Sequence, residues 1–324
     1  MPSRRVIGVD MGGTKLLAGA VDGGLGVHHR VQRTVSGLDQ SSVLNTVQDA
    51  VDELLKSAGT EIAAVGFGIP SLIDRRTGTA VVAVNLNLAN IRFADVMAER
   101  LGLPVFVDND GNVAALAEHQ AGAAVGASEV VLMTIGTGIG GGLILGGRLY
   151  RGSVGAGAEL GHIVIDKDGP RCQGNCPNRG CIEALASGTA LAREARRVAG
   201  ERPESGLGQA LRQGRELAGP LVTELAHDGD AASIEVLGLI GTRLGVAFAS
   251  LVNIFNPELI VVGGGVMAAG ELLLEPARAE VKRRALPPSR DLVRIVSARF
   301  GTEAGMIGAA ALAIDGLAER GVRV

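Results

Sequence analysis

The sequence predicts an α/β protein, because short apolar runs typical of buried strands alternate along the chain with amphipathic segments typical of helices. The chain has 324 residues, a length that suggests about two domains. Glycine accounts for 49 residues, and glycine clusters follow directly after several of the predicted strands. Because glycine lets backbone N–H groups approach a ligand closely, this pattern favours a protein that holds phosphate groups on its turns.

The elements follow one another with clear boundaries. Residues 6–10 and 16–21 flank a Gly/Thr turn and predict a hairpin, and residues 129–145 repeat this strand, turn and strand pattern. Apolar residues recur at helical spacing in 41–58, and a polar stretch near 200–208 interrupts the helical region 183–255. The further strands are predicted at 62–69, 105–107, 259–262 and 293–297, the further helices at 93–101, 112–122 and 305–317, and a loop-rich segment at 152–180.

Composition and charge exclude several classes of protein. With 6 Phe, 1 Tyr and no Trp, a chain that is 47% hydrophobic must build its core from Ala, Val, Leu and Ile. The net charge of −3 gives no electrostatic case for binding nucleic acid. Residues 130–147 carry no charge, but seven of them are glycine, so two strands around a turn fit better than a membrane helix. No signal peptide is predicted at the start, so we expect a cytoplasmic protein.

Two glycine motifs need to be distinguished from known nucleotide-binding loops. The segment around Gly12 and Gly13 has Thr14 before Lys15, the reverse of the Walker A order, and a strand follows it rather than a helix. Residues 136–141 formally match G-x-G-x-x-G, but again no helix follows. The two Gly/Thr hairpins form a weak internal repeat, which predicts two related halves that each hold one end of a phosphate chain. The alternative is that these glycines only make hairpin turns.

Charged and metal-binding residues accompany these turns. Asp10 precedes the first turn and is a candidate for holding Mg²⁺ through water, although an aspartate there can also cap the turn. Cys172, Cys176 and Cys181 lie within ten residues, which favours a metal site over a disulfide framework in a chain without a secretion signal.

The order of the motifs carries a family resemblance. Asp10-x-Gly12-Gly13-Thr14-Lys15, Asn109-Asp110, Glu159-x-x-His162 and the cysteine segment ending in Gly180-Cys181-Ile182-Glu183 follow one another over nearly the whole chain. In this combination the sequence resembles the ROK family of bacterial sugar kinases and related repressors. The cysteine segment and the residues after it look most like the glucokinase-type members.

The resemblance implies a fold and an activity. It implies the two-domain actin/hexokinase-like (ribonuclease H-like) ATPase fold with a cleft between the domains. The smaller N-terminal domain would hold residues 1–111 plus 307–324, and the larger domain residues 112–306 with a zinc-binding loop. The implied reaction is phosphorylation of glucose at the 6-hydroxyl by Mg-ATP, with Asp110 as the general base, in an enzyme that forms a homo-oligomer, commonly a dimer.

The resemblance also assigns residues to each part of this site. Sugar binding would fall to Asn85, Asn109, Asp110, Glu159, His162 and Glu183. The nucleotide and its metal would lie on Asp10, Gly12, Gly13, Thr14, Lys15, Gly136, Thr137, Gly138, Gly263, Gly264 and Gly265. A structural zinc ion would be held by His162, Cys172, Cys176 and Cys181, a donor set that suits a closed tetrahedral site. A helical spacing of three would place Glu159 and His162 on one face of a turn.

Several points stay open at the level of sequence. Three residues separate Cys172 from Cys176 where the family commonly has one, so Cys172 need not be a ligand. Ser71 follows Pro70 where the family usually has glycine, and Asn87 competes with Asn85 for the same role. Another hexose or an N-acetylhexosamine could be the substrate, and polyphosphate could replace ATP. A repressor is disfavoured because nine residues before Asp10 are too few for a helix-turn-helix, and the intact phosphate turns disfavour a non-catalytic sugar-binding protein.

Overall fold

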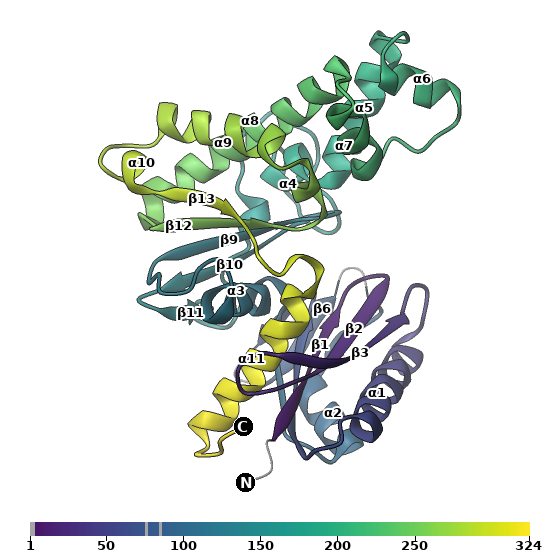
Figure 1. Ribbon diagram of the computed structural model, residues 1–324, viewed down its shortest axis with the longest axis vertical. Coiled ribbons are helices and arrows are strands. Elements are labelled where there is room, and N and C mark those ends of the chain that lie inside the picture. Colours follow the sequence, from purple (N-terminus) through teal and green to yellow (C-terminus); the bar gives the residue numbers. More distant parts are fainter. Residues whose placement is uncertain (1–3, 75–76, 84–85) are drawn as a thin grey trace. The chain divides into compact units, whose positions relative to one another are not determined.

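Strands and helices alternate through most of the structure, a computed structural model that describes residues 4–74, 77–83 and 86–324 (Figure 1). The strands are β1 (Arg5–Met11), β2 (Lys15–Val21), β3 (Val27–Thr34), β4 (Ile62–Ile69), β5 (Ser71–Asp74), β6 (Thr79–Ala83), β7 (Ala89–Ile91), β8 (Val105–Asn109), β9 (Val130–Ile135), β10 (Ile139–Leu145), β11 (Arg148–Tyr150), β12 (Leu259–Gly263) and β13 (Arg294–Ser297). The α-helices are α1 (Gln40–Ser57), α2 (Phe93–Leu101), α3 (Asp110–Ala121), α4 (Ile182–Ala186), α5 (Gly188–Glu201), α6 (Gly206–Arg212), α7 (Gly219–His227), α8 (Ala231–Phe255), α9 (Glu271–Arg284), α10 (Ser289–Leu292) and α11 (Ala304–Glu319). Short 3₁₀ turns are η1 (Leu160–His162), η2 (Gly265–Ala269) and η3 (Gly301–Glu303).

Two five-stranded sheets share one strand order. The first runs β3-β2-β1-β4-β8 and the second β11-β10-β9-β12-β13. In the first, β1 is parallel to β4 and β4 to β8, and in the second, β9 is parallel to β12 and β12 to β13. A hairpin therefore precedes two parallel strands in each sheet, which confirms the two related halves that the internal repeat predicts.

The predicted elements are confirmed with shifts of a few residues at their ends, and the loop-rich segment is irregular apart from η1. The strands that the pattern did not predict are β3, β11 and the small sheet β5-β6-β7. Strand β3 is an edge strand with the sequence VHHRVQRT, and only Val31 in it is buried. An edge strand with so few apolar side chains has neither an alternating nor a continuous apolar pattern.

The contacts divide the chain into two compact units. Unit 1 comprises Met1–Gly126, Gly142–Ala158 and Thr302–Val324, and unit 2 comprises Ala127–Gly141 and Glu159–Gly301. This division differs from the predicted domain boundary at residue 112, because α3 belongs to unit 1. The reason is close packing between α3 and α11, since a side chain on Gly308 would overlap the backbone of Val113. The predicted domain ranges and the cleft stay predictions.

Aliphatic side chains form the core of unit 1, as the composition predicts. Residues of β1, β4, α1 and α2 pack in one buried cluster. Within it, Phe67 and Phe93 meet edge to face with ring centroids 5.2 Å apart. Two of the six phenylalanines therefore supply the largest side chains of this core, and Val, Leu, Ile and Ala fill the rest.

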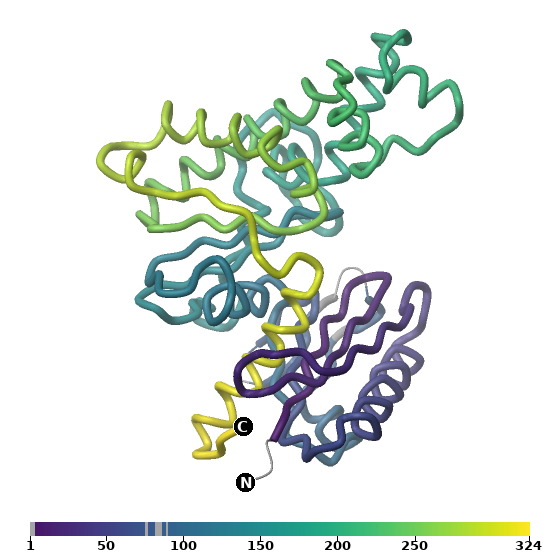
Figure 2. The backbone as a smooth tube through the Cα atoms, in the orientation of Figure 1, coloured from purple at the N-terminus to yellow at the C-terminus, as the bar shows by residue number. Residues whose placement is uncertain are grey.

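Glycine brings α11 into backbone contact with the first sheet. A Cβ on Gly8 of β1 would overlap the carbonyl oxygen of Met306, and one on Gly66 of β4 would overlap that of Ala309. Figure 2 shows the yellow segment of α11 running beside the purple first strand. Part of the glycine excess therefore serves close helix packing rather than phosphate binding.

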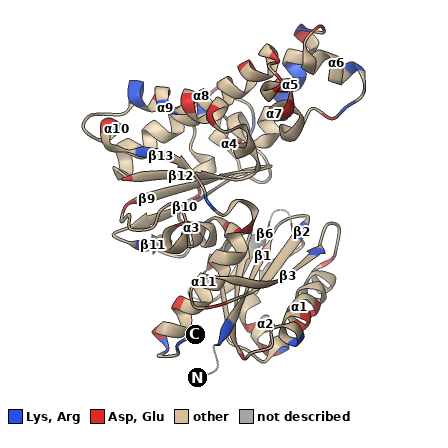
Figure 3. Cartoon of the chain, in the orientation of Figure 1, with Lys and Arg blue, Asp and Glu red and all other residues tan. Residues whose placement is uncertain are grey.

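Among the described residues, α8 is the one helix long and apolar enough to cross a membrane, and 56% of its apolar window is buried. A Cβ on Gly241 would overlap the backbone of Leu273, so α8 packs tightly on α9. Core helices of this kind pass the same length and composition test, so α8 is weak evidence for a membrane span. Charged residues of both signs are interspersed along outer helices such as α1 and α5 (Figure 3).

Candidate functional site

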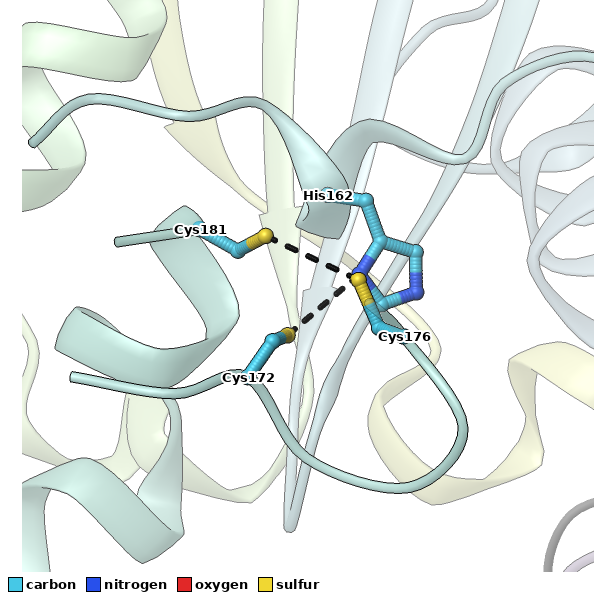
Figure 4. Close-up of side chains that lie close together, drawn as sticks. All are labelled: His162, Cys172, Cys176 and Cys181. Atoms are coloured by element: carbon cyan, nitrogen blue, oxygen red, sulfur yellow. Dashed lines mark hydrogen bonds between the residues drawn. The ribbon is translucent and has the colours of Figure 1, made fainter. Parts of the chain in front are cut away.

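Three cysteines and one histidine meet in unit 2 (Figure 4). One donor atom from each of His162, Cys172, Cys176 and Cys181 lies within 4.8 Å of the others. The Cys172 Sγ is 3.5 Å from the His162 Nδ1, and the Sγ atoms of Cys176 and Cys181 are 3.8 Å apart. The longer spacing before Cys176 therefore does not keep Cys172 out of the cluster.

The loop that carries the cysteines folds back on itself. The backbone N–H of Ile165 donates to the carbonyl of Gly180, and Cys172 donates to Asn178. Gly180 has a φ of +63°, and a Cβ there would overlap the carbonyl oxygen of Asp166. Only glycine fits this position, so the Gly180-Cys181 pair places the third thiol back beside the first two.

The residues fit a zinc ion in their chemistry. Three thiolates and an imidazole are the donor set of closed structural zinc sites. Burial raises the pKa of the Cys172 thiol, and it also raises that of Cys181. Without a cation these thiols stay protonated at neutral pH, so metal binding must release protons.

Glu159 and His162 lie on the turn η1, which Glu159 precedes directly. The His162 Nε2 is 4.0 Å from a Glu159 carboxylate oxygen, while its Nδ1 faces Cys172. The two ring nitrogens therefore face different partners. The Nε2 of His162 thus faces Glu159, and one hydroxyl group could hydrogen-bond to both the Nε2 and the Glu159 carboxylate.

Glu183, the second residue of α4, connects the cysteine cluster to a glycine turn. One carboxylate oxygen accepts the N–H of Ile139 at 2.8 Å, and the other lies 3.7 Å from the Cys172 Sγ. A Cβ on Gly138 would overlap the same carboxylate. Glu183 thus contacts the turn that sequence reasoning assigned to phosphate.

That turn, residues 136–138 between β9 and β10, is held by the start of α5. The N–H of Gly188 donates to the Gly136 carbonyl at 2.8 Å, and the Thr189 hydroxyl donates to the Thr137 carbonyl at 2.8 Å. Sequence reasoning missed Thr189. The signal was a Ser-Gly-Thr triplet at a helix start, which is too common to single out.

The second glycine cluster of unit 2 lies beside this turn. Gly263 ends β12 and pairs with Thr134 of the parallel strand β9. Gly264 has a φ of +90°, and a Cβ there would overlap the backbone of Ile135. Residues 136–138 and 263–265 thus follow neighbouring parallel strands at their carboxyl ends, the edge where α/β sheets bind ligands.

Unit 1 carries the first glycine turn and Asp10. The N–H of Gly12 donates to the Lys15 carbonyl at 2.8 Å, which closes the turn that contains Gly13 and Thr14. Thr14 and Lys15 are exposed. Burial, together with the nearby Asp110 carboxylate, raises the pKa of Asp10 to about 7. The backbone at Gly305, in the first turn of α11, lies directly against the Asp10 carboxylate.

Asp110 and Asn109 stand where β8 turns into α3. The Asn109 side chain caps the helix, because its oxygen accepts the N–H groups of Gly111 and Asn112. The Asn109 amide donates to the Ser71 carbonyl at 3.4 Å. Burial raises the pKa of Asp110, although the N–H of Gly111 donates to its carboxylate at 2.9 Å and opposes the shift.

The sequence leaves three residues open as parts of the sugar pocket: Asn85, Asn87 and Ser71. Asn85 lies outside the described residues. Its competitor Asn87 donates its side-chain amide to the Leu38 carbonyl at 2.6 Å, so it already has a structural contact. The Ser71 hydroxyl donates to the Leu72 carbonyl at 3.2 Å, and it is the Ser71 backbone rather than its hydroxyl that contacts Asn109.

The raised pKa of Asp10 predicts that Asp10→Asn stabilises the metal-free protein at pH 8. Since the pKa of Asp10 is about 7 in the folded chain, against an ordinary aspartate value of 3.8, the folded state holds an extra proton between these two pH values. The free energy of unfolding of the wild type therefore falls as the pH rises from 4 to 7, by up to about 4 kcal/mol for a pKa raised from 3.8 to about 7. Thermal unfolding without magnesium at pH 4, 6 and 8 measures this.

Asp22→Asn is a matched control, for which the expected change in stability has the opposite sign. A hydrogen bond with His28 lowers the pKa of Asp22, so Asp22→Asn is expected to lose stability at neutral pH. If Asp10→Asn unfolds at the same temperature as the wild type at pH 8, burial does not penalise the Asp10 carboxylate.

Comparisons with known proteins match almost the full chain. The model of the ROK family matches residues 6–316. The chain is 36% identical over 315 residues to a glucokinase from Thermotoga maritima, which covers 96% of this chain and 98% of that one. It is 35% identical, also over 315 residues, to a glucokinase from Streptomyces coelicolor, which covers 95% and 96% of the two chains.

Solved structures agree with this likeness. A ROK family glucokinase from Streptomyces griseus in complex with glucose and AMPPNP superposes with a TM-score of 0.85 at 34% identity, covering 95% of this chain and 99% of that chain. This similarity confirms the predicted actin/hexokinase-like fold class. A match over most of the chain to one family model, with full-length relatives above 30% identity, leaves one assignment: the chain belongs to the ROK family.

Proposed function

We propose that this protein is a kinase that phosphorylates glucose at its 6-hydroxyl with ATP. The observation that carries the proposal is the likeness, at 34–36% identity over 95–96% of the chain, to glucokinases, one of them solved with glucose and AMPPNP. The two glycine turns and the partly buried carboxylates of Asp10 and Asp110 are the parts that this reaction needs.

We assign the role of general base to Asp110. Phosphoryl transfer depends on positioning and on neutralising charge, and a carboxylate near the attacking hydroxyl can take its proton as the new O–P bond forms. The burial that raises the pKa of Asp110 makes this carboxylate a stronger base than an exposed aspartate. The transferred proton stays on Asp110 until the product leaves.

The phosphate chain of ATP is assigned to the glycine turns. Backbone N–H groups at 12–14 and 136–138 can donate to phosphate oxygens without a side chain in the way. The pair Asp10 and Asp110 supplies two partly buried carboxylates in unit 1, and Asp10 would hold Mg²⁺ through water. When bound, Mg²⁺ neutralises charge on the phosphates. Gly263, Gly264 and Gly265 would contact the nucleotide from the neighbouring strand.

We assign sugar binding to Asn109 and Asp110 in unit 1 and to Glu159, His162 and Glu183 in unit 2, with Asn85 as a further candidate. Carboxylates and amides suit a sugar because each accepts or donates several hydrogen bonds to hydroxyl groups. The position of the His162 Nε2, 4.0 Å from Glu159, supports a shared contact with one hydroxyl.

The four-residue cluster His162, Cys172, Cys176 and Cys181 is proposed to hold a structural zinc ion. The ion would fix the imidazole of His162 and the loop that leads into Glu183. Since all four donors come from the protein, the ion leaves no open position for substrate and takes no part in the chemistry.

A sugar panel tests the proposed function. The purified protein is incubated with glucose, mannose, fructose, N-acetylglucosamine or N-acetylmannosamine, and with ATP or polyphosphate as donor. We expect the highest kcat/KM for glucose with ATP. Preference for another sugar would redirect the substrate assignment, and sugar binding without phosphorylation of any of them would indicate a non-catalytic regulator.

We also infer a homo-oligomer, most simply a dimer, in the cytoplasm. Three large apolar side chains near the end of α8 and around α10 are about two-thirds exposed: Ile254, Leu286 and Leu292. Exposed apolar groups of this kind support an interface. Light scattering of the purified protein measures the state directly.

A further inference from the structure

Asp108 is a buried carboxylate beside the proposed base, and the proposed reaction gives it no role. It lies on β8 with an exposed fraction of 3%. Its side chain forms an ion pair with the Nε of Arg151, whose own side chain is only 16% exposed. Asp108 is the fourth residue of β8, whereas Asp110 is the first residue of α3, and the Asp108 carboxylate is directed to Arg151.

The other Asp108 oxygen holds the corner between β8 and α3. It accepts the backbone N–H of Asn109 at 2.8 Å and the side-chain amide of Asn112 at 2.8 Å. Asn109 in turn caps α3 through Gly111 and Asn112. Asp110 is the first residue of that helix, so its backbone is fixed by the groups that Asp108 binds.

Arg151 brings a second segment to the same carboxylate. It follows β11 and begins the stretch that leads to Glu159. The Arg151 carbonyl accepts the N–H of Gly157 at 3.0 Å, which closes residues 151–157 into a loop on Arg151. One buried carboxylate thus joins the strand end that carries Asp110 and the loop that starts at Arg151.

A buried ion pair is poor evidence for added stability, because taking both charges out of water offsets much of their attraction. Such a pair does define one geometry, since removing either partner leaves an uncompensated charge. The proposed base Asp110 needs one fixed geometry, because misplacing a reacting group by about 1 Å can lower the rate about 100-fold.

We propose that Asp108 and Arg151 are positioning residues that hold the β8–α3 corner, and with it the Asp110 carboxylate, in the geometry required for proton removal. This inference rests on the proposed function. It assigns neither residue a contact with substrate, so both act through Asp110 and Asn109.

The test compares Asp108→Asn, Arg151→Met and Arg151→Lys in the full-length protein. We expect kcat for glucose phosphorylation to fall by about 100-fold in Asp108→Asn and in Arg151→Met, while the KM for ATP changes by less than about twofold. Arg151→Lys keeps the positive charge. Because the wild-type contact uses a single donor, the Nε of Arg151, a lysine ammonium can take its place. The kcat of this variant should therefore be within about tenfold of the wild-type value. The double variant Asp108→Asn/Arg151→Met should lose little more than either single variant, because the two residues act as one unit.

Glu194→Gln is the matched control. Glu194 forms a buried pair with Arg243 in unit 2, with exposed side-chain fractions of 11% and 23%. It should lower the unfolding temperature as Asp108→Asn does, and leave kcat near the wild-type value. Should Asp108→Asn not fold, the contrast between Arg151→Met and Arg151→Lys decides the question.

Two results would overturn the inference. One is a folded Asp108→Asn or Arg151→Met with wild-type kcat. The other is equal kcat in Arg151→Met and Arg151→Lys. If the positive charge at position 151 holds Asp108 in place, lysine must restore activity that methionine does not. Either result, with an active wild type, leaves the proposed function intact, whereas a wild type inactive on every sugar would remove both.

Discussion

Replacing Asp110 by Ala is expected to lower kcat for glucose phosphorylation by about 10²–10⁴-fold, the usual contribution of a positioned general base. Glucose should still bind, because the Ala variant keeps Glu159, His162 and Glu183. The wild type should lose activity at acid pH as Asp110 takes up a proton. Since burial raises the pKa of Asp110, this loss should begin above the ordinary aspartate value of 3.8.

A coupled assay for ADP release gives kcat, and calorimetry gives the affinity for glucose. Asp39→Asn is the control, because Asp39 accepts the N–H of Ser42 at the start of α1 and Asn retains that capping contact. It should keep wild-type turnover. Wild-type turnover in Asp110→Ala would remove Asp110 from the proposed role of base.

Removal of zinc is expected to destabilise the folded chain. If free zinc is about 1,000-fold above its dissociation constant, its binding stabilises the folded chain by about 4 kcal/mol. For a chain of this size that is about 10 °C in unfolding temperature. Because burial raises the pKa of the Cys172 thiol, protons compete with the metal, and zinc affinity should fall as the pH falls.

The three cysteines of the chain all lie in the cluster, so a thiol reagent reports on it directly. We expect no reactive thiol in the zinc-loaded protein and three after chelation. Cys172→Ser should lower the zinc content and the unfolding temperature, which tests the ligand with the unusual spacing. A purified protein that contains no zinc and does not respond to chelators would contradict the assignment.

The features that could be predicted from the sequence are those that depend on a local pattern of residues. Strand β4 and helix α2 occur at their predicted residues, because continuous apolar runs and helical spacing are strong signals. The cysteine cluster was predictable from three cysteines and one histidine within twenty residues. Asp10 and Asp110 were predictable as residues that follow or end apolar strands.

Long-range partners could not be predicted. Nothing in the sequence connects Asp108 to Arg151, which are 43 residues apart, or Thr189 to the turn at Thr137. Strand β3 was missed because an edge strand needs few apolar side chains. The helix contacts made by Gly8 and Gly66 depend on α11, which lies more than 200 residues further along the chain.

The packing of α11 has a consequence for how the chain folds during synthesis. Unit 1 draws on residues before 127 and after 301, so unit 2 is translated between the first sheet and the helix that covers it. At usual translation rates the wait is on the order of 10 s. During that time β1 and β4 expose the surface that α11 later covers. Unit 1 can therefore complete its fold only after most of unit 2 has been made, and until then one face of its sheet stays uncovered.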